Sequence, residues 1–113
     1  MIFRNIQGVS IDPISYTKAI IAKHPYVTIH VGTDSQSIAK RTQYATVIAY
    51  RFGNRGVHYI VHKIGFPKIK DLWTRLWKET EMSIDIAEKM KGSLNVDIQI
   101  DMDLSLIHIS EPT

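Results

Sequence analysis

Three acidic residues, far apart in the sequence, have the side chains and the positions to hold a divalent cation: Asp34, Glu79 and Asp101. Asp34 follows the alternating apolar run in VTIHVGTDSQ, and a carboxylate at the end of a buried strand costs free energy unless a cation meets it. Crowded carboxylates repel one another, and a hard divalent cation relieves that repulsion. Because the chain has no Cys, oxygen ligands favour Mg²⁺ or Mn²⁺ over zinc.

The elements that must position these acids follow from cap, turn and periodicity signals. In chain order the predicted elements are a helix capped by Ser10 or Asp12 that ends at His24, a strand over 26–33, a polar loop over 35–41, strands over 44–52 and 57–65 joined by the turn GNRG, a helix from Asp71 to Gly92, and a strand over 95–103. This order predicts an α/β fold with a mixed sheet, in which the crossover helix makes the last strand parallel to the first.

Parallel strands side by side bring their carboxyl ends to one edge of a sheet, where open α/β sheets bind ligands. We therefore expect Asp34 and Asp101 to lie close together, and Asp103 to lie nearby. Glu79 falls within the apolar stripe of the long helix and should point toward the sheet; the alternative is an acid at the edge of the helix that reaches water. For Asp97, a half-exposed sheet face is the better explanation.

The segments GTDSQ, KETEMSIDIA and DIQIDMD, in this order and spacing, resemble the ribonuclease-H-like YkuK family of bacterial proteins. The resemblance implies a ribonuclease H-like mixed sheet with the first three strands antiparallel and the fourth parallel to the first. It also implies two bound Mg²⁺ ions, with Asp34, Glu79 and Asp101 in the catalytic and metal-binding roles. Asp103, on the same strand face as Asp101, is our further candidate for a metal ligand. Related proteins continue with another helix, a fifth strand and a C-terminal helix, so the expected domain is a partial one over 1–103.

The last ten residues, LSLIHISEPT, fit this scheme badly. They resemble the translation of a sequencing-library adapter, so 104–113 are expected to be a non-native tail that truncates the domain. The alternative is a short terminal strand, because LSLIHI alternates in polarity.

The favoured function is a two-metal phosphodiester hydrolase, a nuclease, acting on RNA, DNA or a hybrid. Ser35, Gln36, Lys40 and Arg41 are the expected substrate-binding residues, although the two cations also fit an ordinary solvated loop. The main alternative is a non-catalytic module that binds nucleic acid or protein. An actin-like ATPase ranks last, because the loop after the first strand has no glycine.

Other aromatic residues and histidines receive structural interpretations. Trp73 and Trp77 have helical spacing, which favours the core or a dimer surface over stacking with bases. His30 is expected to be an interior histidine rather than a proton shuttle. His58 and His62 lie about 13 Å apart along a strand, too far to share a metal.

Composition indicates one globular domain of 113 residues with a mildly basic net charge of +3. No apolar run is long enough for a membrane span, and no signal peptide precedes the first predicted helix. With no Cys, a cytoplasmic protein is expected.

Overall fold

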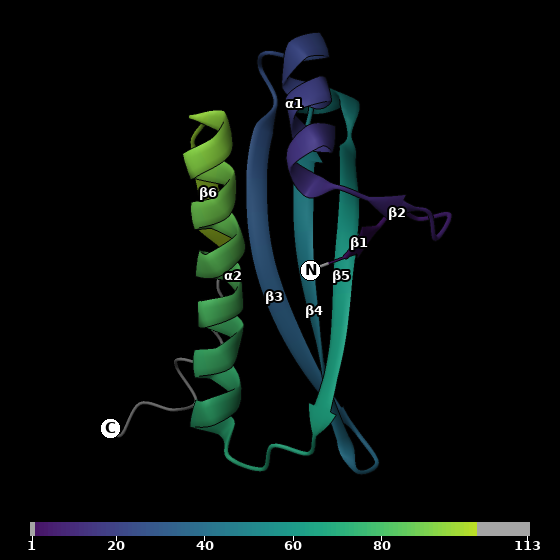
Figure 1. Ribbon diagram of the computed structural model, residues 1–113, viewed down its shortest axis with the longest axis vertical. Coiled ribbons are helices and arrows are strands. Elements are labelled where there is room, and N and C mark those ends of the chain that lie inside the picture. The colour runs from purple at the N-terminus through teal and green to yellow at the C-terminus, as the bar shows by residue number, and fades with distance from the viewer. Residues whose placement is uncertain (1, 102–113) are drawn as a thin grey trace.

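The computed structural model describes residues 2–101, which form one six-stranded sheet and two α-helices (Figure 1). The elements are β1 (Phe3–Arg4), β2 (Ser10–Ile11), α1 (Pro13–Lys23), β3 (Thr28–Ile38), β4 (Arg41–Arg51), the 3-10 turn η1 (Gly53–Arg55), β5 (Val57–Pro67), α2 (Leu72–Leu94) and β6 (Ile98–Asp101). None of the helices in this part of the chain is long and apolar enough to cross a membrane.

The sheet has the strand order β2-β1-β5-β4-β3-β6. Strands β3, β4 and β5 are antiparallel neighbours, and β6 runs parallel to β3 after the crossover through α2. The fold class predicted from the sequence is therefore confirmed, with three antiparallel strands and a fourth parallel to the first of them.

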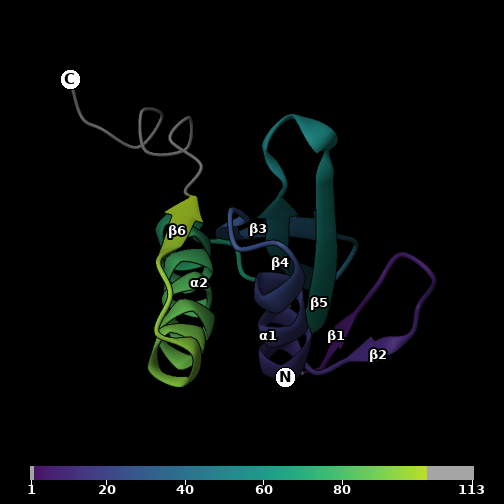
Figure 2. The same cartoon turned by 90° about the horizontal axis from the view of Figure 1, so that it is seen from above.

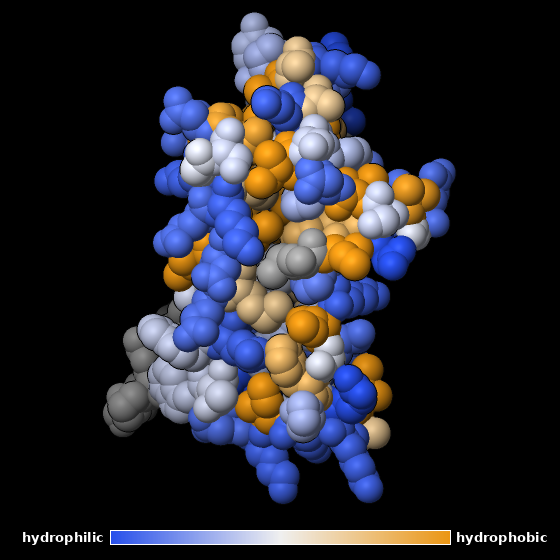
Figure 3. All heavy atoms as spheres, viewed as in Figure 1, coloured by the Kyte–Doolittle hydropathy of each residue, from blue (hydrophilic) through white to orange (hydrophobic). Residues whose placement is uncertain are grey.

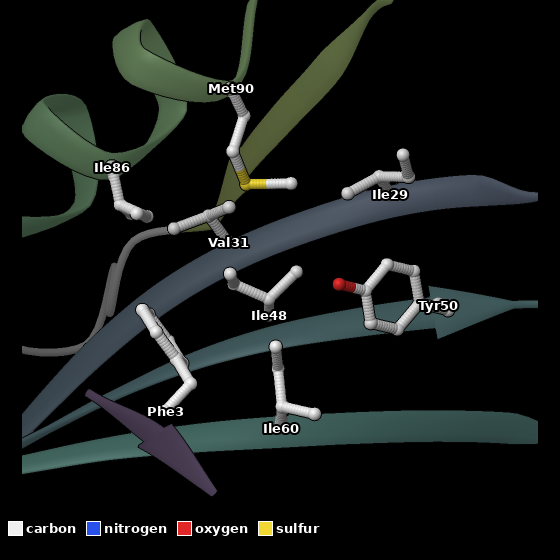
Figure 4. Close-up of a cluster of buried hydrophobic side chains, with 8 residues drawn as sticks. All are labelled: Phe3, Ile29, Val31, Ile48, Tyr50, Ile60, Ile86 and Met90. Atoms are coloured by element: carbon white, nitrogen blue, oxygen red, sulfur yellow. The ribbon is translucent and has the colours of Figure 1, made fainter. Parts of the chain in front are cut away.

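Both helices cover the same face of this sheet (Figure 2). The core lies between them and the sheet, where the side chains of Ile29, Ile48 and Ile60 from three adjacent strands meet Met90 of α2 (Figure 4). All but Ile29 of these four are fully buried. The opposite face of the sheet is covered by no element among residues 2–101 and is called the open face below.

The hairpin between β3 and β4 is longer than predicted. The predicted loop over 35–41 is wrong, because β3 continues to Ile38 and β4 begins at Arg41, with Ala39 in the left-handed region at φ 55°. Polar residues continue the ladder here because each pairs with a neighbour on β4, for example Gln36 with Gln43. Cross-strand pairing therefore overrides a composition typical of loops.

The ends of the helices and the N-terminal strands also differ in part from the predictions. Asp12 caps α1 as predicted, and its side chain accepts the N–H of Ser15 at 3.0 Å. Helix α2 continues past Gly92, and Asn95 takes the left-handed cap conformation with φ 51°. The two-residue strands β1 and β2 were not predicted, since they are too short for a periodic pattern, yet Phe3 of β1 is fully buried.

Candidate active site

Successive side chains of β3 point to opposite faces of the sheet. Ile29 and Val31 belong to the core, whereas His30, Gly32 and Asp34 line a hollow of about 470 Å³ on the open face. The other residues that line this hollow are Thr33, Ala45, Val47, Ala49 and Asp101. The small side chains of β4 form the floor of the hollow, and its acids come from β3 and β6.

The strand register brings two of the three predicted acids together. Asp101 pairs with Gly32, and Asp34 lies two residues further along β3 on the same face. A Cβ atom at Gly32 would lie 3.6 Å from the backbone oxygen of Asp101 and 3.8 Å from its Cβ, so the two strands pack closely at this point. The structure therefore brings Asp34 and Asp101 to one hollow, as the parallel pairing predicts.

His30 adds a basic side chain to this hollow. Its Nδ1 atom lies 3.6 Å from Oδ2 of Asp101, and its Nε2 atom lies 3.3 Å from the hydroxyl of Thr28. The His30 side chain is 23% exposed and that of Asp101 is 57% exposed. His30 is thus a partly exposed residue that lines the hollow, and not the interior histidine that was predicted.

Glu79 lies on the other side of β3. It is 4% exposed on α2, and its carboxylate accepts the hydroxyl of Ser35, which faces the helices. The backbone N–H of Ser35 donates to Oδ1 of Asp34 at 3.0 Å, so Ser35 contacts an acid on each side of the strand. The structure does not bring Glu79 into the hollow with Asp34 and Asp101.

Arg75 completes a polar cluster behind β3 that was missed from the sequence. Its guanidinium donates to the backbone oxygen of Ser35 at 3.2 Å and to the Ser35 hydroxyl at 3.1 Å. Burial raises the pKa of the nearby Tyr44 hydroxyl, the charge of Glu79 raises it further, and Arg75 opposes this rise. The spacing of four residues between Arg75 and Glu79 was the sequence signal that places both on one side of a helix.

The donor set decides which cation the hollow fits. Among residues 2–101, no three His, Cys, Asp or Glu side chains are close enough to hold one metal ion together. Mg²⁺ commonly takes only one or two carboxylates from the protein and fills its other positions with water and phosphate oxygens. Asp34 and Asp101 therefore fit Mg²⁺ by ligand type, and Asp103 lies outside the described residues.

The predicted substrate-binding residues fall in different places. Gln36 is exposed on the open face, on the same side of β3 as Asp34, whereas the Ser35 side chain faces the helices. Lys40 lies in the hairpin turn, and Arg41 begins β4 opposite Ile38, four residues or about 13 Å along the strand from Asp34. These two cations are thus remote from the hollow.

The structure also bears on the predictions for the two tryptophans and for His58 and His62. Trp73 and Trp77 are 56% and 68% exposed, so a core position is wrong for both. The nitrogen atoms of His58 and His62 bind different partners, the hydroxyl of Tyr16 and the backbone oxygen of Ile2, so the two histidines serve separate contacts.

Comparison with known proteins gives one positive result. The family described as Ribonuclease H-like matches residues 13–110, which include both helices and strands β3 to β6. No curated protein and no solved structure matches the chain.

Proposed function

Because the chain belongs to the ribonuclease H-like family, we propose that it is a metal-dependent phosphodiester hydrolase that acts on nucleic acid. One observation carries the proposal: Asp34 and Asp101 come from adjacent parallel strands and share a hollow on the open face. Two carboxylates on the same face of adjacent parallel strands form the kind of oxygen site that suits Mg²⁺ or Mn²⁺.

Each residue of the hollow has a distinct task in this proposal. Asp34 and Asp101 hold the cation, and His30 fixes the orientation of the Asp101 carboxylate through its Nδ1 atom. When bound, the divalent cation acts as a Lewis acid on a phosphoryl oxygen and lowers the pKa of water. The small floor residues Ala45 and Val47 leave room for a backbone phosphate next to the acids.

Glu79 remains the third proposed ligand, and it needs a change of position to serve. Strand β6 pairs with β3 only as far as Gly32, so from Thr33 onward no described strand covers the outer edge of β3. The Glu79 carboxylate accepts the hydroxyl of Ser35, whose backbone N–H donates to Asp34, so Ser35 links the third proposed ligand to the first. Asp103 stays a proposed fourth ligand.

Cleavage of labelled RNA, DNA and hybrid substrates in Mg²⁺ tests this function. We expect Asp34→Asn to lower the rate by at least 10- to 100-fold, because even the outer partners of metal ligands have effects of roughly that size. Asp97→Asn is the matched control, since Asp97 is an exposed acid just before β6 and outside the hollow. An equal rate for wild type and Asp34→Asn contradicts the proposal.

The second candidate is a module that binds nucleic acid without cleaving it. The absence of a three-ligand group among residues 2–101, with Glu79 held behind β3, favours this candidate. It predicts that the wild-type chain binds oligonucleotides equally well with Mg²⁺ and with EDTA, and that Asp34→Asn leaves binding unchanged. Cleavage by the wild-type chain separates the two candidates, and Glu79→Gln tests whether Glu79 serves as the third ligand.

A further inference from the structure

Two exposed tryptophans lie on one flank of α2 and take no part in the proposed active site. Trp73 and Trp77 are one helical turn apart and therefore neighbours on the helix surface. Their exposed fractions, 56% and 68%, are far above those of Leu76 and Glu79, which face the sheet. Packing within residues 2–101 therefore leaves much of this pair of indole rings in solvent.

The charge around these rings shows which partner they suit. Residues 68–78 contain four cations (Lys68, Lys70, Arg75 and Lys78) and one acid, Asp71, so this segment carries a net charge of +3. The whole chain also carries +3, and its other residues hold ten cations and ten acids. All of the net positive charge is thus concentrated in the segment that carries both tryptophans.

The fold adds further positive charge at this end of the molecule. The backbone N–H of Lys68 donates to the backbone oxygen of Lys40, which brings the β3–β4 hairpin turn with its exposed Lys40 and Arg41 to the start of α2. Hydrophilic side chains gather over this end in the space-filling view (Figure 3). Lys78 packs on the Phe66 ring at 4.2 Å, so the exposed cations nearest to the tryptophans in sequence are Lys68 and Lys70.

We propose that Trp73 and Trp77, with Lys68 and Lys70, form a stacking platform for the bases of single-stranded nucleic acid. Every base has a π-face, so exposed indoles bind unpaired bases with little sequence preference while the lysines bind phosphates. Bases in a duplex are already stacked on one another, so the platform selects single strands. This inference deepens the proposed function, on which it rests, because it names the form of the substrate.

A second copy of this chain is the competing occupant. A two-fold interface places the same surface of both copies in contact, so two segments of charge +3 would face each other. Like charges at close range oppose such an interface, whereas a polyanion neutralises them. The charge therefore favours nucleic acid over self-association.

The experiment uses the two tryptophans as their own probe, since the chain contains no others. We expect a short oligothymidylate to quench tryptophan fluorescence at low salt in EDTA, and the matching duplex to quench it much less. Trp77→Ala should weaken oligothymidylate binding roughly 5- to 150-fold but leave the binding of inorganic polyphosphate, which has no bases, unchanged. Lys70→Gln should weaken both. Tyr26→Ala is the control, because Tyr26 is 93% exposed outside this segment and should have no effect.

Three results would overturn the platform: fluorescence that does not respond to oligothymidylate, equal affinity of wild type and Trp77→Ala, or a dimer in sedimentation that Trp77→Ala converts to a monomer. Circular dichroism shows that each variant is folded. Binding in EDTA does not depend on metal chemistry. Quenching in EDTA with no cleavage in Mg²⁺ would therefore contradict the hydrolase and support the platform. Cleavage in Mg²⁺ with no quenching in EDTA would support the hydrolase and contradict the platform.

Discussion

His30 and Asp101 face each other across the adjacent parallel strands β3 and β6, with 3.6 Å between Nδ1 and Oδ2. The pair lies in the hollow that also contains Asp34, on the face of the sheet that no described helix covers. In the proposed site, His30 orients the Asp101 carboxylate beside Asp34, so that both acids can bind one cation. Substitutions at these residues separate this role from a role in stability.

Asp101→Asn should change the free energy of unfolding by less than about 1 kcal/mol. The contact with His30 is partly exposed, and even a fully charged exposed pair contributes only roughly 0.2–1 kcal/mol. Urea denaturation of wild type and variant measures the difference. A loss of more than about 2 kcal/mol would mean that Asp101 has a structural role, which the proposed site does not give it.

Ser35→Ala should lower the free energy of unfolding by about 1–3 kcal/mol. The hydroxyl of Ser35 donates to the buried carboxylate of Glu79 and accepts from Arg75, and removing it leaves buried polar groups with one partner fewer. Ser37→Ala is the matched control, because the Ser37 hydroxyl has a single 3.3 Å contact with Thr42. Urea denaturation that shows equal stability for both variants would contradict the importance of this cluster.

Stability should fall as the pH rises from about 10 through about 12. Burial raises the pKa of Tyr50 to about 12, and the hydrogen bond with the Thr17 hydroxyl acts in the opposite direction. Since the folded-state pKa lies above the unfolded value near 10, the unfolded chain loses the proton first, and roughly 2–3 kcal/mol is lost across this window. Tyr50→Phe should flatten the pH profile of the melting temperature, and an unchanged slope would contradict this assignment.

The sequence predicts the order of the main elements and the two acids in the hollow, because these depend on local signals. Periodicity gives the strand face, Asp12 gives a cap, and the crossover rule gives the parallel pairing that brings Asp34 and Asp101 together. Local signals therefore predict the elements, and the crossover rule predicts how they bring the two acids together.

The position of Glu79 is not predictable in the same way. Its place in the apolar stripe of α2 was correctly read as inward-facing, but the side of β3 that it contacts depends on how α2 packs against Ser35. Likewise, the length of the β3–β4 hairpin depends on pairing between residues such as Gln36 and Gln43, which no local propensity reveals. Tertiary contacts decide both features.

The most direct test of the central claim is the melting temperature of the chain as Mg²⁺ is added at constant ionic strength. At a Mg²⁺ concentration a hundred times Kd, binding stabilises the fold by about 2.7 kcal/mol, and we expect a rise of roughly 10 °C in wild type and in Asp97→Asn. Asp34→Asn and Asp101→Asn should each lose this rise. A wild-type melting temperature that does not change with Mg²⁺, or an equal rise in Asp34→Asn, would contradict a cation site shared by Asp34 and Asp101.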